Sequence, residues 1–186
     1  MTHKAGSGHP GGSLSAIDAL VVLYLRHMRV RPEDPLWHER DMFFLSKGHC
    51  TPAYYAVMAA RGYFPREELL TFRAMGSRLQ GHPSNTHLPG VDSSSGSLGQ
   101  GLSLANGAAL AARYEGLGAR YYVMIGDGES QEGQIWEAAM TAAAQGLDNV
   151  CAIVDVNGIQ LDGPVESVKS LGDLPAKWRA FGWNVI

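Results

Sequence analysis

Two apolar runs, "YYVMIG" at 121–126 and "VCAIVDV" at 150–156, constrain the fold of this chain more than any other feature. Neither run shows a regular alternation with polar residues, so each strand is expected to be apolar on both faces. A helix-like stretch at about 132–145 separates them, and the run "DMFFLS" at 41–46 has the same character. Strands of this kind, joined through helices, predict an α/β fold with a parallel sheet flanked by helices on both faces.

The remaining elements follow from apolar spacing and from helix start and stop signals. We expect a mostly buried helix from an N-cap at Ser13 to Met28, with further helices at 51–61, after Pro65, at 98–114 and at 174–181. We expect a loop through Gly163-Pro164 after the strand at 150–156, and the last residues, "WNVI", predict the start of another strand. Residues 75–97 have few apolar side chains and many turn formers, and loops of that length are usually functional or disordered.

Length and composition exclude several classes of protein. At 186 residues the chain has the size of one domain, so we expect residues 1–186 to form a single domain. Its 15 Lys and Arg face 18 Asp and Glu, and no basic cluster is dense enough to follow a nucleic-acid backbone. The longest apolar stretch, 16–25, is interrupted by Asp18 and is too short to cross a bilayer. Neither nucleic acid nor a membrane is an expected partner.

The N-terminus and the cysteines indicate a cytoplasmic protein. The first residues lead directly into a Gly-rich loop without an apolar segment, which argues against secretion. Cys50 and Cys151 lie in unlike surroundings, and no CxxC pair occurs. Two buried free thiols in a reducing cytoplasm are the simplest interpretation.

A carboxylate and an amide follow two neighbouring strands of the predicted sheet. Asp127 stands between Gly126 and Gly128 after the first strand, and Asn157 ends the next one, thirty residues later. If the strands are neighbours, the two side chains converge at one edge of the sheet, where ligands of parallel sheets bind. Together with a loop carbonyl beyond Asn157 and phosphate oxygens, they would form the oxygen shell that Mg²⁺ prefers. The alternative interpretation is a plain turn at the end of a strand.

Three of the seven histidines stand in loops that contain glycine: His9, His49 and His82. Glycine beside histidine lets a ligand approach an exposed imidazole, which could bind phosphate or hydroxyl oxygens and move protons near neutral pH. The alternative is that each ring makes an ordinary hydrogen bond to the backbone. Zinc is less favoured, because no HxxxH or HExxH spacing occurs.

Two acidic residues, Glu129 and Glu132, begin the helix after Asp127. Acidic side chains are common there because they complement the helix dipole, so these residues alone do not separate a structural from a functional role. The nearby "GSLGQGLSLANG" has Leu104 where a dinucleotide-binding motif needs its third glycine, and there is no P-loop.

Four stretches together resemble the cofactor-binding half of the transketolase family: "SGHPGGSLSAID", "FLSKGHCTPAYYA", "GHPSNTHLPGVDSSSGSLGQGLSLANG" and "GDGESQEGQIWEA…VDVNGIQLDG". They occur in the order of the family and cover nearly the whole chain. Gly-Asp-Gly followed by Asn about thirty residues later is the general thiamine diphosphate signature, and the histidine loops narrow it to the transketolase branch.

The resemblance implies a set of roles. Asp127, Asn157 and the carbonyl of Ile159 would hold Mg²⁺. Gly128 would lie against the diphosphate, with Asn157 also beside the cofactor. The remaining roles are these: His49 near the cofactor phosphates, Gly96 and Leu98 along its aminopyrimidine, His9 and His82 on the ketose hydroxyls, and Glu132, chosen over Glu129, at a subunit interface.

The implied activity is transfer of a two-carbon ketol unit from a ketose phosphate to an aldose, with thiamine diphosphate as the electron sink. The glutamate that activates the cofactor lies in the family's pyrimidine-binding half, so we expect a C-terminal partner subunit and a heterotetramer, or at least a dimer. Relative to the family, the chain is expected to be incomplete at both ends. The alternatives are a Mg–thiamine diphosphate module without catalysis, a related enzyme for another sugar, and a dinucleotide-dependent oxidoreductase.

Overall fold

Three parallel strands form the centre of the computed structural model, which describes all residues 1–186. They are β1 (Met42–Leu45), β2 (Tyr121–Gly126) and β3 (Val150–Asp155), hydrogen-bonded in the order β1-β2-β3. In this register, Leu45 pairs with Met124 and Gly126 pairs with Asp155, so the carboxyl ends of the strands lie together. The parallel α/β sheet expected from the apolar runs is confirmed.

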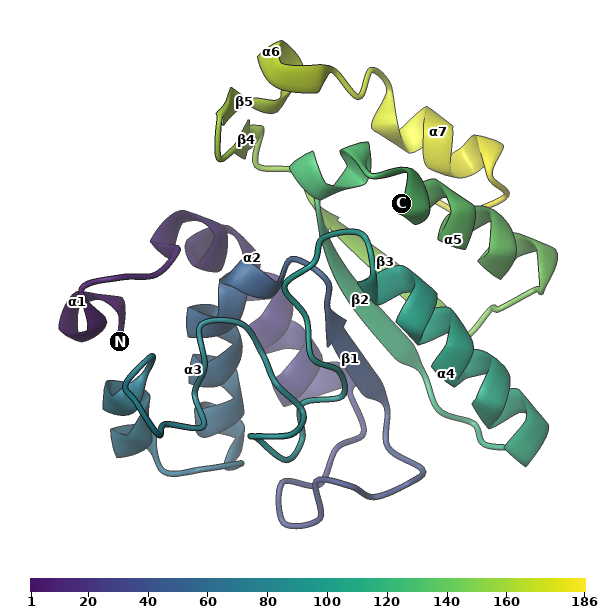
Figure 1. The fold of residues 1–186 in the computed structure, drawn as a ribbon. Coiled ribbons are helices and arrows are strands. Elements are labelled where there is room, and N and C mark those ends of the chain that lie inside the picture. The colour runs from purple at the N-terminus through teal and green to yellow at the C-terminus, as the bar shows by residue number, and fades with distance from the viewer.

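Side chains of β1 and β2 point alternately into two separate cores. One core of 22 buried residues takes Phe43 and Tyr122, and the other, of 19, takes Phe44 and Val123. Helices α2 (Pro10–Val22) and α3 (Thr51–Arg61) cover the first face, and α4 (Gly101–Glu115), α5 (Gly133–Ala144) and α7 (Leu174–Ala180) cover the second (Figure 1). Both faces of the sheet are therefore desolvated, as the continuous apolar runs require.

The first long helix departs from expectation in its start and in its exposure. After the short α1 (Thr2–Ala5), α2 begins at Pro10, because proline is preorganised for the first helical position, and ends in a π-helical segment at Leu23–His27. Ser13 is therefore not the N-cap but a buried residue inside the helix. The expectation of a mostly buried helix was also wrong, since only three residues of α2 are buried and Leu14 is 75% exposed.

The expected helix at 51–61 coincides with α3, and α4 begins three residues later than expected. The helix starts later because the backbone at Gly99 has a φ of 86°, which is incompatible with an α-helix. Short 3₁₀ segments occupy Gly48–Cys50, Arg66–Thr71 and Gly128–Gln131, so the helix expected after Pro65 is a 3₁₀ helix. Residues 75–97 contain no helix or strand, as expected, but Leu79, Leu88 and Val91 anchor that loop in the first core.

The C-terminal part differs from the sequence-based expectation in two places. Residues after β3 form a short antiparallel hairpin, β4 (Ile159–Gln160) and β5 (Gly163–Pro164), followed by α6 (Val165–Lys169), where we expected only a loop. The strand expected at 183–186 is absent. Those residues lie along the outer edge of β3 without pairing to it, and the Trp183 ring nitrogen instead donates to the Ala139 carbonyl of α5.

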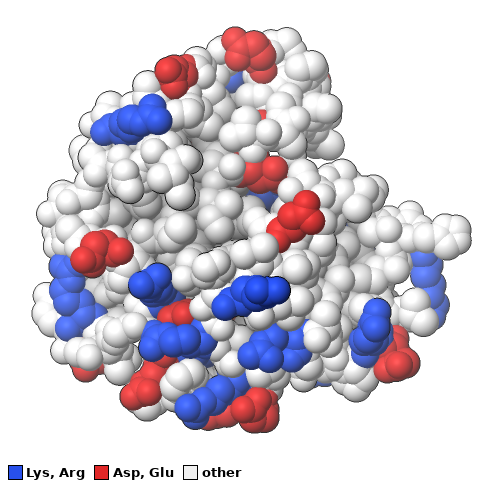
Figure 2. Space-filling model, turned by 180° about the vertical axis from the view of Figure 1, so that it is seen from behind, with Lys and Arg blue, Asp and Glu red and all other residues white.

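Charged side chains of both signs are mixed on the face shown in Figure 2, most densely across its lower half. None of the helices has the length and apolar character that a bilayer span requires. The two cysteines are free, but only Cys50 is buried, with burial raising the pKa of its thiol to about 11. The expectation that Cys151 is also buried was wrong, because β3 is an edge strand and exposes it.

Candidate active site at the carboxyl end of the sheet

Asp127 sits directly after β2 and is only 4% exposed. One carboxylate oxygen accepts the backbone N–H of Gly128 at 2.8 Å, and the other accepts that of Gly158 at 2.7 Å. The second bond reaches across to the loop after β3, so the pairing of β2 with β3 brings the Asp127 side chain against the backbone of the Asn157–Gly158 loop. Each carboxylate oxygen keeps a lone pair for a further ligand.

Asn157 and Ile159 lie at the mouth of this site and are exposed. The Asn157 amide oxygen accepts the Ile159 N–H at 3.0 Å, and its amide nitrogen donates to the Ser15 hydroxyl at 3.3 Å. Nowhere do three His, Cys, Asp or Glu side chains gather into one ligand set. A metal here would therefore need the mixed donors that Asp127, Asn157 and a backbone carbonyl provide, which are the hard oxygen ligands of Mg²⁺.

Glu129 and Glu132, which the residues alone did not distinguish, have opposite environments. Glu129 is 2% exposed and accepts hydrogen bonds from the Ser46 hydroxyl, the Gly99 N–H at 2.8 Å and the Gly126 N–H at 3.0 Å. Burial raises the pKa of its carboxyl despite these bonds. Through these three hydrogen bonds, Glu129 connects the ends of β1 and β2 to the loop before α4. Glu132 is exposed at the rim, beside Gly99.

Sequence reasoning missed a buried ion pair, Lys47 with Asp155. The Lys47 ammonium is buried and lies 2.5 Å from the Asp155 carboxylate, which also accepts the Ser15 hydroxyl at 2.5 Å. The sequence did contain an indication of this ion pair, because Lys47 closely follows β1 and Asp155 is the single charge in an otherwise apolar run. Charged side chains are almost never fully buried unless they are paired.

The carboxyl end of the sheet has more negative than positive buried charge. Asp127 and Glu129 are buried there, Asp155 is partly buried beside them, and Lys47 is the one cationic side chain among them. Buried charges are stable when they are paired or coordinate a metal. A divalent cation near Asp127 would offset this excess, and the residues present thus fit a magnesium site.

The three predicted histidines come together around this end of the sheet. The rings of His9 and His49 pack edge to face with centroids 5.4 Å apart. Burial, followed by the charge of Lys47, lowers the pKa of His49 to about 4. Partial burial and the nearby charge of Arg73 lower the pKa of His82 as well. Both rings are thus neutral near pH 7 and offer one donor and one acceptor nitrogen each.

Glycines allow the loops of the site to approach one another. A Cβ on Gly12 would lie 3.0 Å from the His49 ring, one on Gly48 would lie 2.6 Å from the Ser95 hydroxyl, and one on Gly128 would lie 3.0 Å from Gln160. Gly96, with a φ of 151°, lies against the His82 ring. Next to it, Leu98 is 39% exposed and faces no core, so Gly96 and Leu98 form an accessible wall near the histidines.

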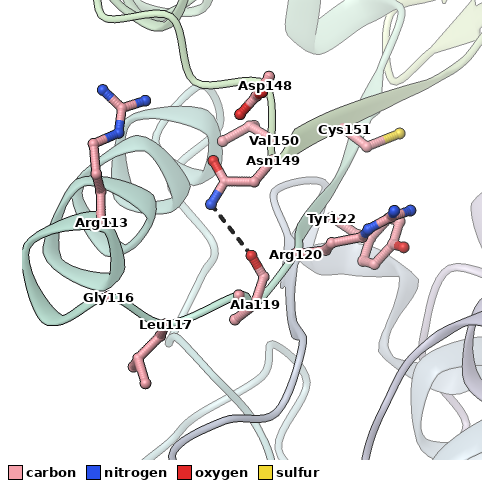
Figure 3. A pocket seen from close by; sticks show the side chains of 11 residues that line it. Arg113, Gly116, Leu117, Ala119, Arg120, Tyr122, Asp148, Asn149, Val150 and Cys151 are labelled. Atoms are coloured by element: carbon pink, nitrogen blue, oxygen red, sulfur yellow. Dashed lines mark hydrogen bonds between the residues drawn. The ribbon is translucent and has the colours of Figure 1, made fainter.

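A separate hollow lies elsewhere, at the amino ends of β2 and β3 (Figure 3). It has a volume of about 650 Å³ and is lined by residues 116–120 and 148–151, together with Arg113 and Tyr122. Within its lining, the Asn149 side-chain amide donates to the Ala119 carbonyl at 3.2 Å. None of the predicted site residues line this hollow, and we assign the candidate site to the opposite end of the sheet.

Comparison with known proteins agrees with this geometry. The profile of the family described as "Transketolase, thiamine diphosphate binding domain" matches residues 1–186. The chain is 50% identical over 182 residues to the 6-deoxy-6-sulfo-D-fructose transketolase subunit SqwG of Clostridium sp. (strain MSTE9), covering 98% of this chain and 66% of that protein. It is 44% identical over 186 residues to an apulose-4-phosphate transketolase subunit of Phocaeicola vulgatus, covering 100% of this chain and again 66% of the relative.

A solved structure is similar over the whole chain. The crystal structure of transketolase from Campylobacter jejuni superposes with a TM-score of 0.93 at 34% identity, covering 100% of this chain and 30% of that one. The chain thus spans 66% of the length of the curated subunits above and a smaller part of the larger transketolase.

Proposed function

Because this chain belongs to the transketolase family, as its thiamine diphosphate binding domain, we propose that it holds thiamine diphosphate through Mg²⁺ and supplies half of a ketol-transferring active site. One observation carries the proposal. Asp127 and the Asn157–Gly158 loop meet across neighbouring strands, at the end of the sheet where buried negative charge exceeds positive charge.

Three residues would hold the metal: Asp127 with its carboxylate, Asn157 with its amide oxygen and Ile159 with its backbone carbonyl. The free lone pairs of Asp127 and the exposure of Asn157 and Ile159 support this set. Asp127 and Asn157 together bring one negative charge, which leaves the bound ion able to attract a diphosphate.

The cofactor would lie between the metal and the histidines. Gly128 would contact the diphosphate, since its lack of a side chain keeps that surface open. His49 would donate to the phosphates or to the cofactor body, and Asn157 would contact the cofactor as well as the metal. Gly96 and Leu98 would line the aminopyrimidine, which their exposure beside His82 supports.

When bound, thiamine diphosphate supplies the electron sink for breaking the carbon–carbon bond next to a ketose carbonyl. The chain's own residues would orient the sugar. His9 and His82 would hydrogen-bond its hydroxyls and assist proton transfer, with the His82 ring, whose pKa is lowered by burial, available as a neutral acceptor. Glu132, exposed at the rim, would reach the cofactor or the opposing subunit.

We also propose that the site is completed by a C-terminal transketolase subunit that binds the pyrimidine end, in a heterotetramer or at least a dimer. The relatives named as transketolase subunits support this assembly. The reaction would move a ketol unit from a ketose phosphate to an aldose. A second candidate is a transketolase for another sugar, favoured by the sulfofructose and apulose phosphate named for the relatives.

The test combines binding and turnover. Thiamine diphosphate is titrated calorimetrically into the protein with Mg²⁺, and the protein mixed with its C-terminal partner is then assayed for ketol transfer between sugar phosphates. We expect binding that Asp127→Ala abolishes, and turnover that requires the partner. Binding without turnover under every condition would instead identify a non-catalytic cofactor module. Stabilisation by NAD but not by Mg–thiamine diphosphate would indicate an oxidoreductase and overturn the proposal.

A further inference from the structure

Residues 96–99, which carry the accessible wall formed by Gly96 and Leu98, have little support from the backbone of the protein. They lie outside every helix and strand, and none of them makes a backbone–backbone hydrogen bond. Leu98 packs into neither core, and Gly99 has a φ of 86°, which prevents α4 from extending back through the segment. The position of the wall therefore depends on contacts with side chains.

Glu129 is the side chain that holds this segment. Its carboxylate accepts the Gly99 N–H at 2.8 Å, which is the only hydrogen bond that any of residues 96–99 makes. The same oxygen accepts the Ser46 hydroxyl, and that hydroxyl accepts the Gly101 N–H at 3.1 Å. A Cβ on Gly101 would lie 2.5 Å from the Ser46 side chain, so the two are in direct contact. The segment is thus fixed at the point where it enters α4.

The turn that carries Glu129 also carries the proposed metal ligand. Glu129 follows Asp127 by two residues, in the 3₁₀ segment Gly128–Gln131, and its second oxygen accepts the Gly126 N–H at 3.0 Å. Ser130 fixes this turn, since it is fully buried and donates to the Gly126 carbonyl at 3.0 Å and to the Asp127 carbonyl at 2.9 Å. One turn therefore determines the positions of both the metal ligand and the wall.

We propose that Glu129 is a positioning residue that sets the distance between Asp127 and the Gly96–Leu98 wall, and so fits the site to a ligand with one anionic end and one planar ring. The identity of that ligand, thiamine diphosphate, rests on the proposed function. Glu129 acts through the backbone amides that it binds, because its side chain is only 2% exposed. Binding groups must be held to within about 0.5 Å, which requires a supporting side chain of fixed length.

The decisive variant is Glu129→Asp, which keeps the negative charge but shortens the side chain by a methylene group. The carboxylate can still serve the Gly126 N–H of its own turn but no longer reaches the Gly99 N–H. We expect the Kd for Mg–thiamine diphosphate, measured calorimetrically, to rise about ten-fold or more, because a hydrogen bond to a charged acceptor is lost. The Kd for Mg–pyrophosphate, which occupies only the metal end, should change less than about two-fold.

Two further variants separate reach from charge. Glu137→Asp makes the same change at an exposed position of α5 and should leave both Kd values unchanged. Glu129→Gln keeps the length and one acceptor oxygen but removes the charge, so it should bind Mg–thiamine diphosphate more tightly than Glu129→Asp does. The reverse order would overturn the proposal. So would an unchanged affinity for Mg–thiamine diphosphate in Glu129→Asp, or an equal loss of affinity for both ligands.

A second arm needs no cofactor. Hydrogen exchange is compared between the wild type and Glu129→Asp, both free of thiamine diphosphate and metal. Amides of residues 97–101 should exchange about ten-fold or more faster in the variant, whereas those of 157–160, beside Asp127, should keep their rates. Unchanged exchange at 97–101 would overturn the positioning role. A wild type that does not bind Mg–thiamine diphosphate but shows this difference would refute the proposed function and leave the support of the wall by Glu129 standing.

Discussion

The two ends of the sheet differ in how they neutralise buried charge. At the amino end, each buried carboxylate has its own arginine: Asp41 pairs with Arg29 at 2.9 Å, and Asp92 pairs with Arg40 at 2.6 Å. Asp41 also accepts the backbone N–H groups of Arg29 and Arg120, both at 2.9 Å. These carboxylates are paired within the chain itself, although a hollow of about 650 Å³ lies nearby.

At the carboxyl end, three carboxylates share one lysine, and backbone N–H groups provide most of the remaining partners. A bound cation would complete such a site. In this molecule, uncompensated charge marks the candidate site, whereas the hollow at the amino end lies beside carboxylates that are already paired.

Replacing Asp127 by Asn should have the largest effect. The variant keeps the size of the side chain but removes the charged ligand of the metal, so affinity for Mg–thiamine diphosphate should fall about 1000-fold, or about 4 kcal/mol. Calorimetric titration measures this loss, and circular dichroism checks that the variant is folded. An affinity close to that of the wild type would remove the central distinction between the two ends.

Asp41→Ala should show the opposite pattern. It leaves two backbone N–H groups and a guanidinium without their acceptor, and we expect a loss of about 3 kcal/mol in the free energy of unfolding. Urea denaturation measures that loss. Cofactor affinity, determined on the folded variant, should stay unchanged. A marked drop in affinity would mean that the amino end contributes to the site.

An added methyl group should destabilise the protein at the carboxyl end of the sheet and not at its amino end. Gly48→Ala places a Cβ 3.0 Å from the Gly96 backbone nitrogen and 2.6 Å from the Ser95 hydroxyl, so overpacking should cost about 2 kcal/mol of stability and weaken cofactor binding. Gly118→Ala, which lies at the amino-end hollow with no atom within 4 Å of the new Cβ, is the matched control. Thermal unfolding of the two variants side by side makes the comparison, and equal losses would contradict it.

The smallest expected effect concerns pH. The pKa of His49 is lowered from 6.5 to about 4, mainly by burial, so the folded protein resists a proton that the unfolded chain accepts. The stability present above pH 6.5 should fall as the pH drops towards 4. Because the ring is partly exposed, we discount the effect to about 1 kcal/mol. His49→Gln should flatten the profile of urea denaturation between about pH 7 and 4.5, whereas His38→Gln at the surface should not.

Much of the fold could be predicted because its signals are local. Uniform apolar runs and the Gly-Asp-Gly turn located β2 and β3 within a residue, and the same pairing placed Asp127 against the backbone of the Asn157–Gly158 loop. The strand at 183–186 failed because apolar β-formers do not specify a pairing partner. Those side chains lie beside β3 without forming backbone hydrogen bonds to it.

The parts of the site that could not be predicted depend on contacts between distant residues. Lys47 and Asp155 are 108 positions apart, and nothing local indicates that the lysine is buried. Glu129 and Glu132 look alike in sequence. In the fold, Glu129 is buried after β2, whereas Glu132 is exposed at the rim of the site. Arg73 likewise has a left-handed backbone, with a φ of 60°, because its N–H bonds to the Leu79 carbonyl in the closed loop, and its residue type gives no indication of this.

Hydrogen exchange of the backbone amides, with and without thiamine diphosphate and Mg²⁺, tests the assignment of the site most directly. We expect protection to increase at 126–129 and 157–160, where the Gly128 and Gly158 amides bind Asp127, and only when both cofactor and metal are present. Residues 116–120 and 148–151, around the amino-end hollow, should exchange as before. Protection confined to the hollow, or independent of Mg²⁺, would contradict the assignment of the site to the carboxyl end of the sheet.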